Sequence, residues 1–171
     1  FLPLSHSFER MVAWVYLSNG VAIAFAESNE TIGRDLVQLK PTVMTGVPRV
    51  FEKLQSRILE KGNALTGLKR ALFQWAMSAG LRVRSAIAER LVFAKVRDGL
   101  GGRFRFVVSG SAALNEEVGR FFFGVGLPII EGYGLTETSP VAIANPVTIQ
   151  EWSGQIGVPV PSTEAAILDD D

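Results

Sequence analysis

Short apolar runs alternate along the chain with longer segments in which apolar residues recur every three or four positions. The short runs have the length of β-strands and few polar positions, which is typical of parallel strands covered on both faces. The order of strand, helix and strand predicts right-handed crossovers and a mainly parallel sheet. The expected strands lie at residues 21–26, 42–46, 104–108 and 127–130.

Two helices are expected between the N-terminus and the second of these strands. The first begins near Phe8 and ends at Gly20, because its apolar residues follow one helical face up to that glycine. Ser5 or Ser7 is expected to cap it. The second helix occupies residues 31–39, and a following proline stops it.

The pattern from residue 50 to residue 98 is helical throughout and predicts a helical insert. Its glycines are expected to separate shorter helices, and most of its charged residues, including Arg82 and Arg84, are expected on a solvated side. Both signs of charge occur there, so the insert is unlike a basic membrane-binding helix. The separating glycines are Gly62, Gly67 and Gly80.

The last third of the chain adds a helix and a loop-rich end. Asn115 is a favoured cap, and Glu116 and Glu117 suit the positive end of a helix dipole, so a helix is expected to begin there. Residues 152–171 are rich in Gly, Pro and β-branched residues and are expected to turn into one more strand. The fold class is therefore α/β: a mainly parallel sheet flanked by helices, with a helical insert and a β- and loop-rich C-terminal end.

Composition excludes several classes of protein. The 171 residues balance 17 Lys and Arg against 17 Asp and Glu, which gives no electrostatic footprint for nucleic acid. The absence of cysteine excludes disulfides, a thiol nucleophile and Cys-based metal sites, and a single histidine, His6, excludes a His-rich zinc site. No run of about 18 uninterrupted apolar residues occurs, so no transmembrane helix is expected.

Both ends of the sequence have the character of interior points of a longer protein. The first residues include neither an initiator Met nor a basic and apolar leader, so no secretory signal is expected. The last residues, Ile167-Leu168-Asp169-Asp170-Asp171, have a strand-like pattern with a turn beginning. The length corresponds to about one domain.

Residues 127–140 concentrate the polar chemistry. Their apolar run gives way to Gly132-Tyr133-Gly134, where two glycines allow the backbone to bend tightly around one aromatic ring. Thr136-Glu137-Thr138 then offers hydroxyl and carboxylate oxygens just past the carboxyl end of a strand, where open α/β sheets bind ligands. An aromatic face can stack on a base, a hydroxyl can meet a phosphate, and a carboxylate can hold Mg²⁺. The segment therefore predicts a nucleotide site.

The run from Gly132 to Thr138 closely resembles the Tyr-Gly-x-Thr-Glu motif of the adenylate-forming superfamily, which comprises acyl-CoA ligases, peptide-synthetase adenylation domains and luciferases. Ser109-Gly110-Ser111-Ala112-Ala113 looks like the small-residue loop that lies along the adenine in that family, although many members have a second glycine where Ser109 or Ser111 stands here. Leu2-Pro3-Leu4-Ser5-His6 is similar to the family's Pro-Leu-x-His segment beside the acyl pocket.

Three further segments extend the resemblance. Residues 47–53, and residues 88–93 with the following 100–103, resemble segments of long-chain fatty acyl-CoA ligases, and the helical insert also suits that branch. Residues 154–159 look like the family's Gly-x-x-Gly-x-Pro segment, whose expected role is structural. The aromatic residues Trp14, Trp75 and 121–123 can line an acyl tunnel, but most are expected to belong to the core.

The resemblance implies roles for individual residues. Tyr133 would stack on adenine, Thr136 would contact the α-phosphate, and Glu137 would ligate Mg²⁺. His6 would orient the carboxylate or the adenylate, which makes His6, Thr136 and Glu137 the expected catalytic residues. The remaining residues expected to border the nucleotide or the acyl group are Gly110, Ser111, Ala112, Glu131, Gly132 and Gly134.

The resemblance also implies a reaction for the parent protein. It would activate a long-chain fatty acid with Mg²⁺ and ATP to acyl-AMP, and then transfer the acyl group to coenzyme A. Residues 1–171 would be a fragment of the N-terminal AMP-binding domain, without the phosphate loop ending in Pro-Lys-Gly and without the C-terminal domain with its catalytic lysine. The isolated chain is not expected to complete adenylation. Adenylation of an aryl or amino acid, or a non-catalytic nucleotide-binding or interaction module, are the alternatives.

The implied partners are fatty acid, ATP and coenzyme A, and no nucleic acid is expected. The expected location is cytoplasmic, and a long-chain substrate makes a peripheral membrane contact compatible with it. Self-association of the isolated chain is also expected to be favourable if a sheet edge and apolar surface are exposed.

Overall fold

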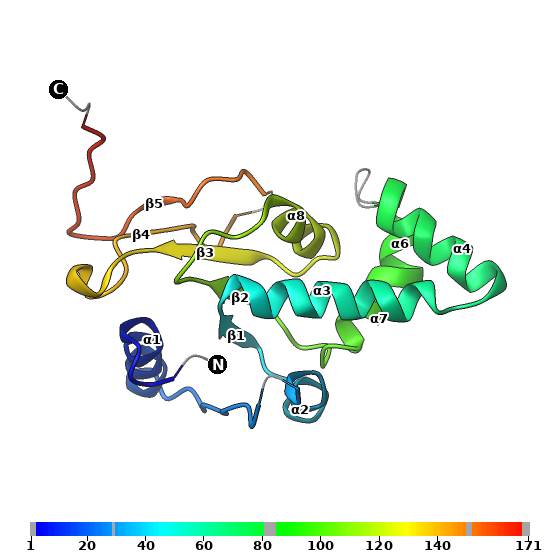
Figure 1. Cartoon of the computed structure of the whole chain (residues 1–171), viewed down its shortest axis with the longest axis horizontal. Coiled ribbons are helices and arrows are strands. Elements are labelled where there is room, and N and C mark those ends of the chain that lie inside the picture. Colours follow the sequence, from blue (N-terminus) through cyan, green and yellow to red (C-terminus); the bar gives the residue numbers. More distant parts are fainter. Residues whose placement is uncertain (1–2, 29, 81–84, 150–151, 169–171) are drawn as a thin grey trace.

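The structure, a computed structural model, describes residues 3–28, 30–80, 85–149 and 152–168 (Figure 1). Some residues named in the sequence analysis lie outside the described residues: Leu2, Arg82, Arg84 and residues 169–171.

A five-stranded sheet in the order β1-β2-β3-β4-β5 forms the centre of the fold. Its first three strands are parallel. Gly46 and Ser109, the last residues of β1 and β2, lie in register with Glu131, and β3 continues two residues farther to Tyr133. β4 and β5 add to β3 as short antiparallel strands. The predicted mainly parallel sheet is therefore confirmed, and the strand expected near the C-terminus is β5. The strands are β1 (Val43–Gly46), β2 (Phe106–Ser109), β3 (Ile129–Tyr133), β4 (Ile143–Ala144) and β5 (Val158–Pro159).

Helices connect the parallel strands, and the expected helical insert is present as several short pieces (Figure 1). None of the described helices combines the length and the apolar character needed to cross a membrane. The α-helices are α1 (Ser7–Ser18), α2 (Ile32–Leu39), α3 (Pro48–Asn63), α4 (Gly67–Trp75), α6 (Ala86–Ala88), α7 (Ala94–Asp98) and α8 (Glu116–Gly124). Two π-helical turns, η1 (Ala76–Gly80) and η2 (Glu89–Phe93), and a 3₁₀ turn, η3 (Thr136–Thr138), complete the set.

The expected break at Gly62 is wrong, because α3 continues through this residue to Asn63. Gly62 is buried, and a Cβ atom placed on it would collide with the ring of Phe73 in α4. The glycine therefore permits α4 to pack closely on α3 and does not end the helix. Gly67 does mark a break, since α4 begins there with a left-handed φ of 56°.

Aromatic side chains of α3 and α8 form the centre of the core. The rings of Phe51 and Phe122 are fully buried, with centroids 5.9 Å apart and planes at 79°, an edge-to-face contact. The expectation that residues 121–123 belong to the core is confirmed. Trp14 and Trp75 lie outside the core, with exposed fractions of 68% and 39%.

The strand expected at residues 21–26 is also wrong, because these residues form no ladder. A cavity of about 560 Å³ lies between this segment and β1, and residues of α1 and α2 also line this cavity. The side chains of Val21 and Phe25 are exposed. An apolar strand needs both a hydrogen-bonded neighbouring strand and cover on its faces. The described residues supply no neighbouring strand and only partial cover to this segment.

The N-terminal cap of α1 differs from the prediction as well. The Nδ1 atom of His6 accepts the backbone N–H of Phe8 at 3.2 Å, so His6 is the cap residue and neither Ser5 nor Ser7 is. Farther along α1, the hydroxyl of Thr45 in β1 donates to the buried carboxylate of Glu9 at 3.0 Å. Both bonds fix the start of α1 beside the carboxyl edge of the sheet.

Candidate functional site

The end of β3 and the turn after it form the centre of the site. Tyr133 is the last residue of β3 and its ring is half exposed. Gly134 follows where the chain folds back on itself, and a Cβ atom there would collide with the carbonyl oxygen of Pro140. Gly132 differs, because no atom lies within 4 Å of the place of its Cβ. Gly134 therefore allows the tight turn, whereas no packing contact requires a glycine at position 132.

Thr138 holds the η3 turn in shape. Its Oγ1 accepts the backbone N–H of Leu135 at 2.8 Å and lies 2.9 Å from the carbonyl oxygen of Pro140. Thr136 and Glu137, in the same turn, are exposed. Within the described ranges, the carboxylate of Glu137 has no hydrogen bond and no ion pair. The turn thus presents a hydroxyl and a free carboxylate to a ligand.

Helix α1 brings a second group to this turn. The Ser7 Oγ lies 3.4 Å from the Thr136 Oγ1, although the two residues are 129 positions apart in sequence. Because the Nδ1 of His6 accepts a hydrogen bond, the proton of the neutral ring resides on Nε2. His6 is exposed, so this Nε2–H can donate to a carboxylate or phosphate oxygen.

The small-residue loop after β2 lies under α1. Gly110 is buried, and a Cβ atom on it would lie 3.1 Å from the ring of Phe8, so only glycine packs there without displacement of the ring. Ser111 has a left-handed φ of 71°, and its side chain and that of Ala112 are exposed. The exposed part of the loop is therefore Ser111 and Ala112, whereas Gly110 contacts the protein interior.

Glu131 is turned toward the protein and not toward the surface. It is buried, and its carboxylate accepts the backbone N–H of Leu114 at 3.3 Å. Burial raises the pKa of Glu131, and the Leu114 hydrogen bond opposes this increase. Its backbone N–H donates to the Oδ1 of Asn145 at 2.9 Å, and the Nδ2 of Asn145 donates to the carbonyl oxygen of Gln155 at 2.8 Å. Glu131 and Asn145 together join β3 to the loops on either side.

The segment at 154–159 has a structural part in the same region. Gly157 has a φ of 102°, and a Cβ atom there would collide with the backbone of Ala144 in β4. This close approach allows Val158 to pair with Ala144 as β5 joins the sheet. The segment therefore supports the strands behind the η3 turn.

Two residues of this site have no sequence-based expectation of a site role. The sequence predicts Ser7 only as a possible helix cap and carries no signal of its contact with Thr136. Asn145 lies in a loop where neither spacing nor composition marks it. Both act through contacts between residues distant in sequence, which local patterns do not encode.

A metal ion could use one protein carboxylate here. Within the described part of the chain, no cluster of three or more His, Cys, Asp or Glu side chains is placed to hold a metal. Mg²⁺ nevertheless fits a site of this kind, because it is commonly bound through one or two carboxylates, several waters and the phosphates of a substrate. The exposed and unpaired carboxylate of Glu137 has the chemistry for such a ligand.

Comparison with known proteins gives consistent matches. The family model described as AMP-binding enzyme matches residues 1–171. The chain is 36% identical to a long-chain-fatty-acid–CoA ligase of Mycobacterium bovis, over 99% of this chain and 30% of that protein. It is 37% identical to the peroxisomal long chain acyl-CoA synthetase 6 of Arabidopsis thaliana, over 99% of this chain and 25% of that protein.

A solved structure has the same fold. The crystal structure of a long-chain-fatty-acid-CoA ligase from Archaeoglobus fulgidus superposes with a TM-score of 0.61 over 92% of this chain and 27% of that chain, at 15% sequence identity. Relative to the two curated proteins named above, the chain spans 25 to 30% of their length.

Proposed function

Because the chain belongs to the AMP-binding enzyme family, we propose that it is part of the N-terminal AMP-binding domain of a long-chain fatty acid–CoA ligase. The observation that carries the proposal is the joint exposure of Tyr133, Thr136 and Glu137 at the carboxyl edge of parallel strands. Two curated relatives, more than one third identical over 99% of this chain, have names that describe the same reaction on long-chain substrates.

The proposed reaction has two steps. A carboxylate oxygen of the fatty acid attacks the α-phosphorus of ATP, the bond to the β-phosphate oxygen breaks, and acyl-AMP and pyrophosphate form. The sulfur of coenzyme A, after loss of its proton, then attacks the acyl carbon, and AMP leaves. The first step is needed because a free carboxylate is a poor electrophile, whereas AMP is a good leaving group.

Each residue of the η3 turn has a role in this proposal. The half-exposed ring of Tyr133 stacks on the adenine. The hydroxyl of Thr136 donates to an α-phosphate oxygen, and Ser7 holds that hydroxyl in place. Glu137 is the carboxylate that would hold Mg²⁺, which screens the negative charge of the phosphates when it is bound.

The acyl side of the site is assigned to α1 and the loop after β2. The Nε2–H of His6 donates to the carboxylate of the fatty acid or to the adenylate, and so orients it toward the α-phosphorus. Ser111 and Ala112, exposed in the loop, border the adenine or the acyl group. Glu131 and Gly110 are both buried, so they contribute by positioning the backbone and not by direct side-chain contact with the substrate. Gly134 contributes the turn itself.

The rest of the machinery lies in other parts of the protein under this proposal. A phosphate loop and a lysine-bearing C-terminal domain would complete the enzyme, because the chain spans 25 to 30% of the length of its curated relatives. The chain alone therefore binds a nucleotide at most and does not complete adenylation.

We also propose a cytoplasmic location with a peripheral membrane contact, which a long-chain substrate favours. Self-association of the isolated chain belongs to the same proposal. The outer edge of β1 has no strand beside it within the described ranges, and apolar side chains near it are exposed, including Val21 and Leu39.

The deciding experiment is fatty-acid-dependent exchange between ATP and pyrophosphate by the full-length protein, with short, medium, long, aryl and amino acids compared. Exchange should be highest with long fatty acids and should fall about 100-fold or more in Glu137→Ala. Glu117→Ala, an exposed carboxylate in the first turn of α8, is the matched control and should retain exchange. Exchange only with aryl or amino acids would refute the long-chain assignment, and no exchange with any acid would refute the ligase.

A further inference from the structure

Helix α3 carries a row of cations on one face. Arg49, Lys53 and Arg57 follow one another at intervals of four residues, so their side chains emerge one above the other. In the described ranges none of the three makes a hydrogen bond or an ion pair within 4.0 Å. Three arginines elsewhere each pair with a carboxylate: Arg34, Arg97 and Arg120.

The same three cations line a cavity of about 250 Å³ between α3 and the start of α2. Its apolar lining includes Val50 and Leu54, both buried. This volume corresponds to roughly eight water molecules at about 30 Å³ each, which is room for a phosphate or pyrophosphate group. We refer to this cavity, with its three cations, as the α3 groove.

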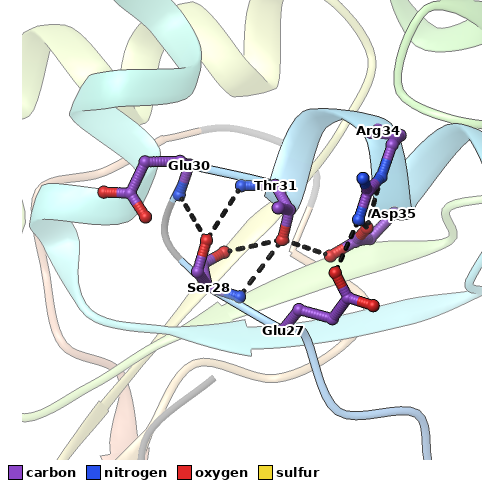
Figure 2. A network of polar contacts seen from close by, with 6 residues as sticks. All are labelled: Glu27, Ser28, Glu30, Thr31, Arg34 and Asp35. Carbon is purple, nitrogen blue, oxygen red and sulfur yellow. Dashed lines mark hydrogen bonds and ion pairs between the residues drawn. The ribbon is translucent and has the colours of Figure 1, made fainter.

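Charge in the α3 groove is not balanced by the protein. Among the described residues that line the groove, Glu30 is the one acid, against three cations. The pKa of Glu30 is lowered by hydrogen bonding with Ser28 and its own backbone, and further by the charges of Lys53 and Arg57. The first turn of α3 has no acidic residue, so the positive end of the helix dipole adds to the same potential. Figure 2 shows Glu30 beside Ser28 at the start of α2, next to Thr31.

The row of three cations is unfavourable for the stability of helix α3 but favourable for the binding of an anion. Like charges four residues apart destabilise a helix, and cations near its N-terminus do so as well. An apolar floor strengthens the field above it, because fewer water dipoles screen the charges there. Guanidinium groups bind phosphate oxygens through two parallel hydrogen bonds, and an ammonium adds a point charge.

We propose that the α3 groove is a binding site for a phosphate group, supplied either by a small phosphorylated molecule or by a lipid headgroup. It is distinct from the η3 turn, because no residue that lines it belongs to β3 or to η3. Arg49 and Arg57 provide the two guanidinium groups, and Lys53 lies between them.

The experiment compares the full-length protein with two matched double variants. Arg49→Gln with Arg57→Gln removes two charges from the α3 groove, and Lys69→Gln with Arg70→Gln removes two charges from exposed positions in α4. Equilibrium dialysis with labelled pyrophosphate tests the free source. Flotation with phosphatidylcholine vesicles, with and without phosphatidic acid, tests the lipid source. Circular dichroism melting shows whether each variant is folded.

The groove variant should lose at least tenfold in affinity for pyrophosphate, for phosphatidic acid vesicles, or for both, whereas the α4 variant should bind like the unmodified protein. Which ligand is lost identifies the source. Arg49→Lys with Arg57→Lys, which keeps the charge but not the paired hydrogen bonds, should lose part of the affinity.

Three outcomes would overturn the proposal: equal binding by both double variants, an equal loss in both, or no binding of either ligand by the unmodified protein. If the groove variant does not fold, the exposed single change Lys53→Gln decides the question by the same comparison, with Lys69→Gln as its control.

Discussion

The start of α2 and the η3 turn contain the same kinds of polar side chain but satisfy them differently. At the start of α2, the hydroxyl of Thr31 lies 2.8 Å from the carboxylate of Asp35, and Arg34 bridges that carboxylate and Glu27 (Figure 2). The Oγ of Ser28 accepts the backbone N–H groups of residues 30 and 31. Nearly every polar group drawn there has a partner within the chain.

The η3 turn leaves its groups available. Thr138 holds the turn, while the side chains of Tyr133 and Glu137 are exposed and have no hydrogen-bond partner among the described residues. The difference teaches how to separate structural from functional polar residues in this fold. A hydroxyl or carboxylate with partners in its own segment shapes a loop, whereas one held on a rigid turn without partners is available to a ligand. Three predictions test that distinction.

Removal of the Tyr133 ring should have the largest effect. Tyr133→Ala should raise the KM for ATP in the exchange reaction about tenfold or more, because stacking on a base contributes about 1–3 kcal/mol. Stability should change little, since the ring is half exposed. Tyr133→Phe keeps the ring and should behave like the unmodified protein. An unchanged KM for ATP in Tyr133→Ala would mean that the adenine binds elsewhere. It would contradict the view that the exposed groups near the η3 turn bind the ligand.

The contiguous part of the candidate site is the part whose arrangement in space follows most directly from the sequence. Tyr133, Thr136 and Glu137 lie within one strand end and one turn, so their order in the chain fixes their positions in space. The three parallel strands are predictable for a related reason, since a short apolar run that is covered on both faces has few other structures open to it. Local pattern and local structure coincide in these regions.

The errors arise where a partner from elsewhere decides the structure. Residues 21–26 have the same apolar pattern as the true strands, but a pattern does not specify the neighbour a strand needs. Gly62 has the signal of a helix end, yet the ring of Phe73 requires a glycine there within α3. The cap formed by His6 and the contact of Ser7 with Thr136 likewise depend on three-dimensional placement.

Two buried carboxylates should give opposite dependences of stability on pH. The hydrogen bond from Thr31, with those from Arg34, lowers the pKa of Asp35, so its stabilising contribution is present above its unfolded pKa and is lost as pH falls through the folded value. Burial raises the pKa of Glu131, so the folded state holds that proton more tightly. Its contribution is present at low pH and is lost as pH rises through the folded value.

The measurement is the urea midpoint of the chain across about pH 3 to 8, the range that spans both carboxyl groups. Asp35→Asn should flatten the loss of stability on the acid side, whereas Glu131→Gln should flatten the loss on the neutral side. Glu131→Gln keeps an oxygen for the N–H of Leu114 and so serves as a conservative change. If the urea midpoint of both variants changes with pH as it does in the unmodified chain, neither carboxyl group is coupled to folding.

The smallest expected effect belongs to Ser7, which lies on the border between the two kinds of polar group. Its hydroxyl is 3.4 Å from that of Thr136, a long contact between partly exposed groups, so its loss should cost about 0.5 kcal/mol and lower kcat/KM for exchange about twofold in Ser7→Ala. Ser5→Ala, two residues away, should change nothing. A loss of tenfold or more in kcat/KM in Ser7→Ala would mean that the Ser7 hydroxyl contacts the substrate directly. A residue that acts only by orienting the Thr136 hydroxyl through one long contact should have a much smaller effect on kcat/KM.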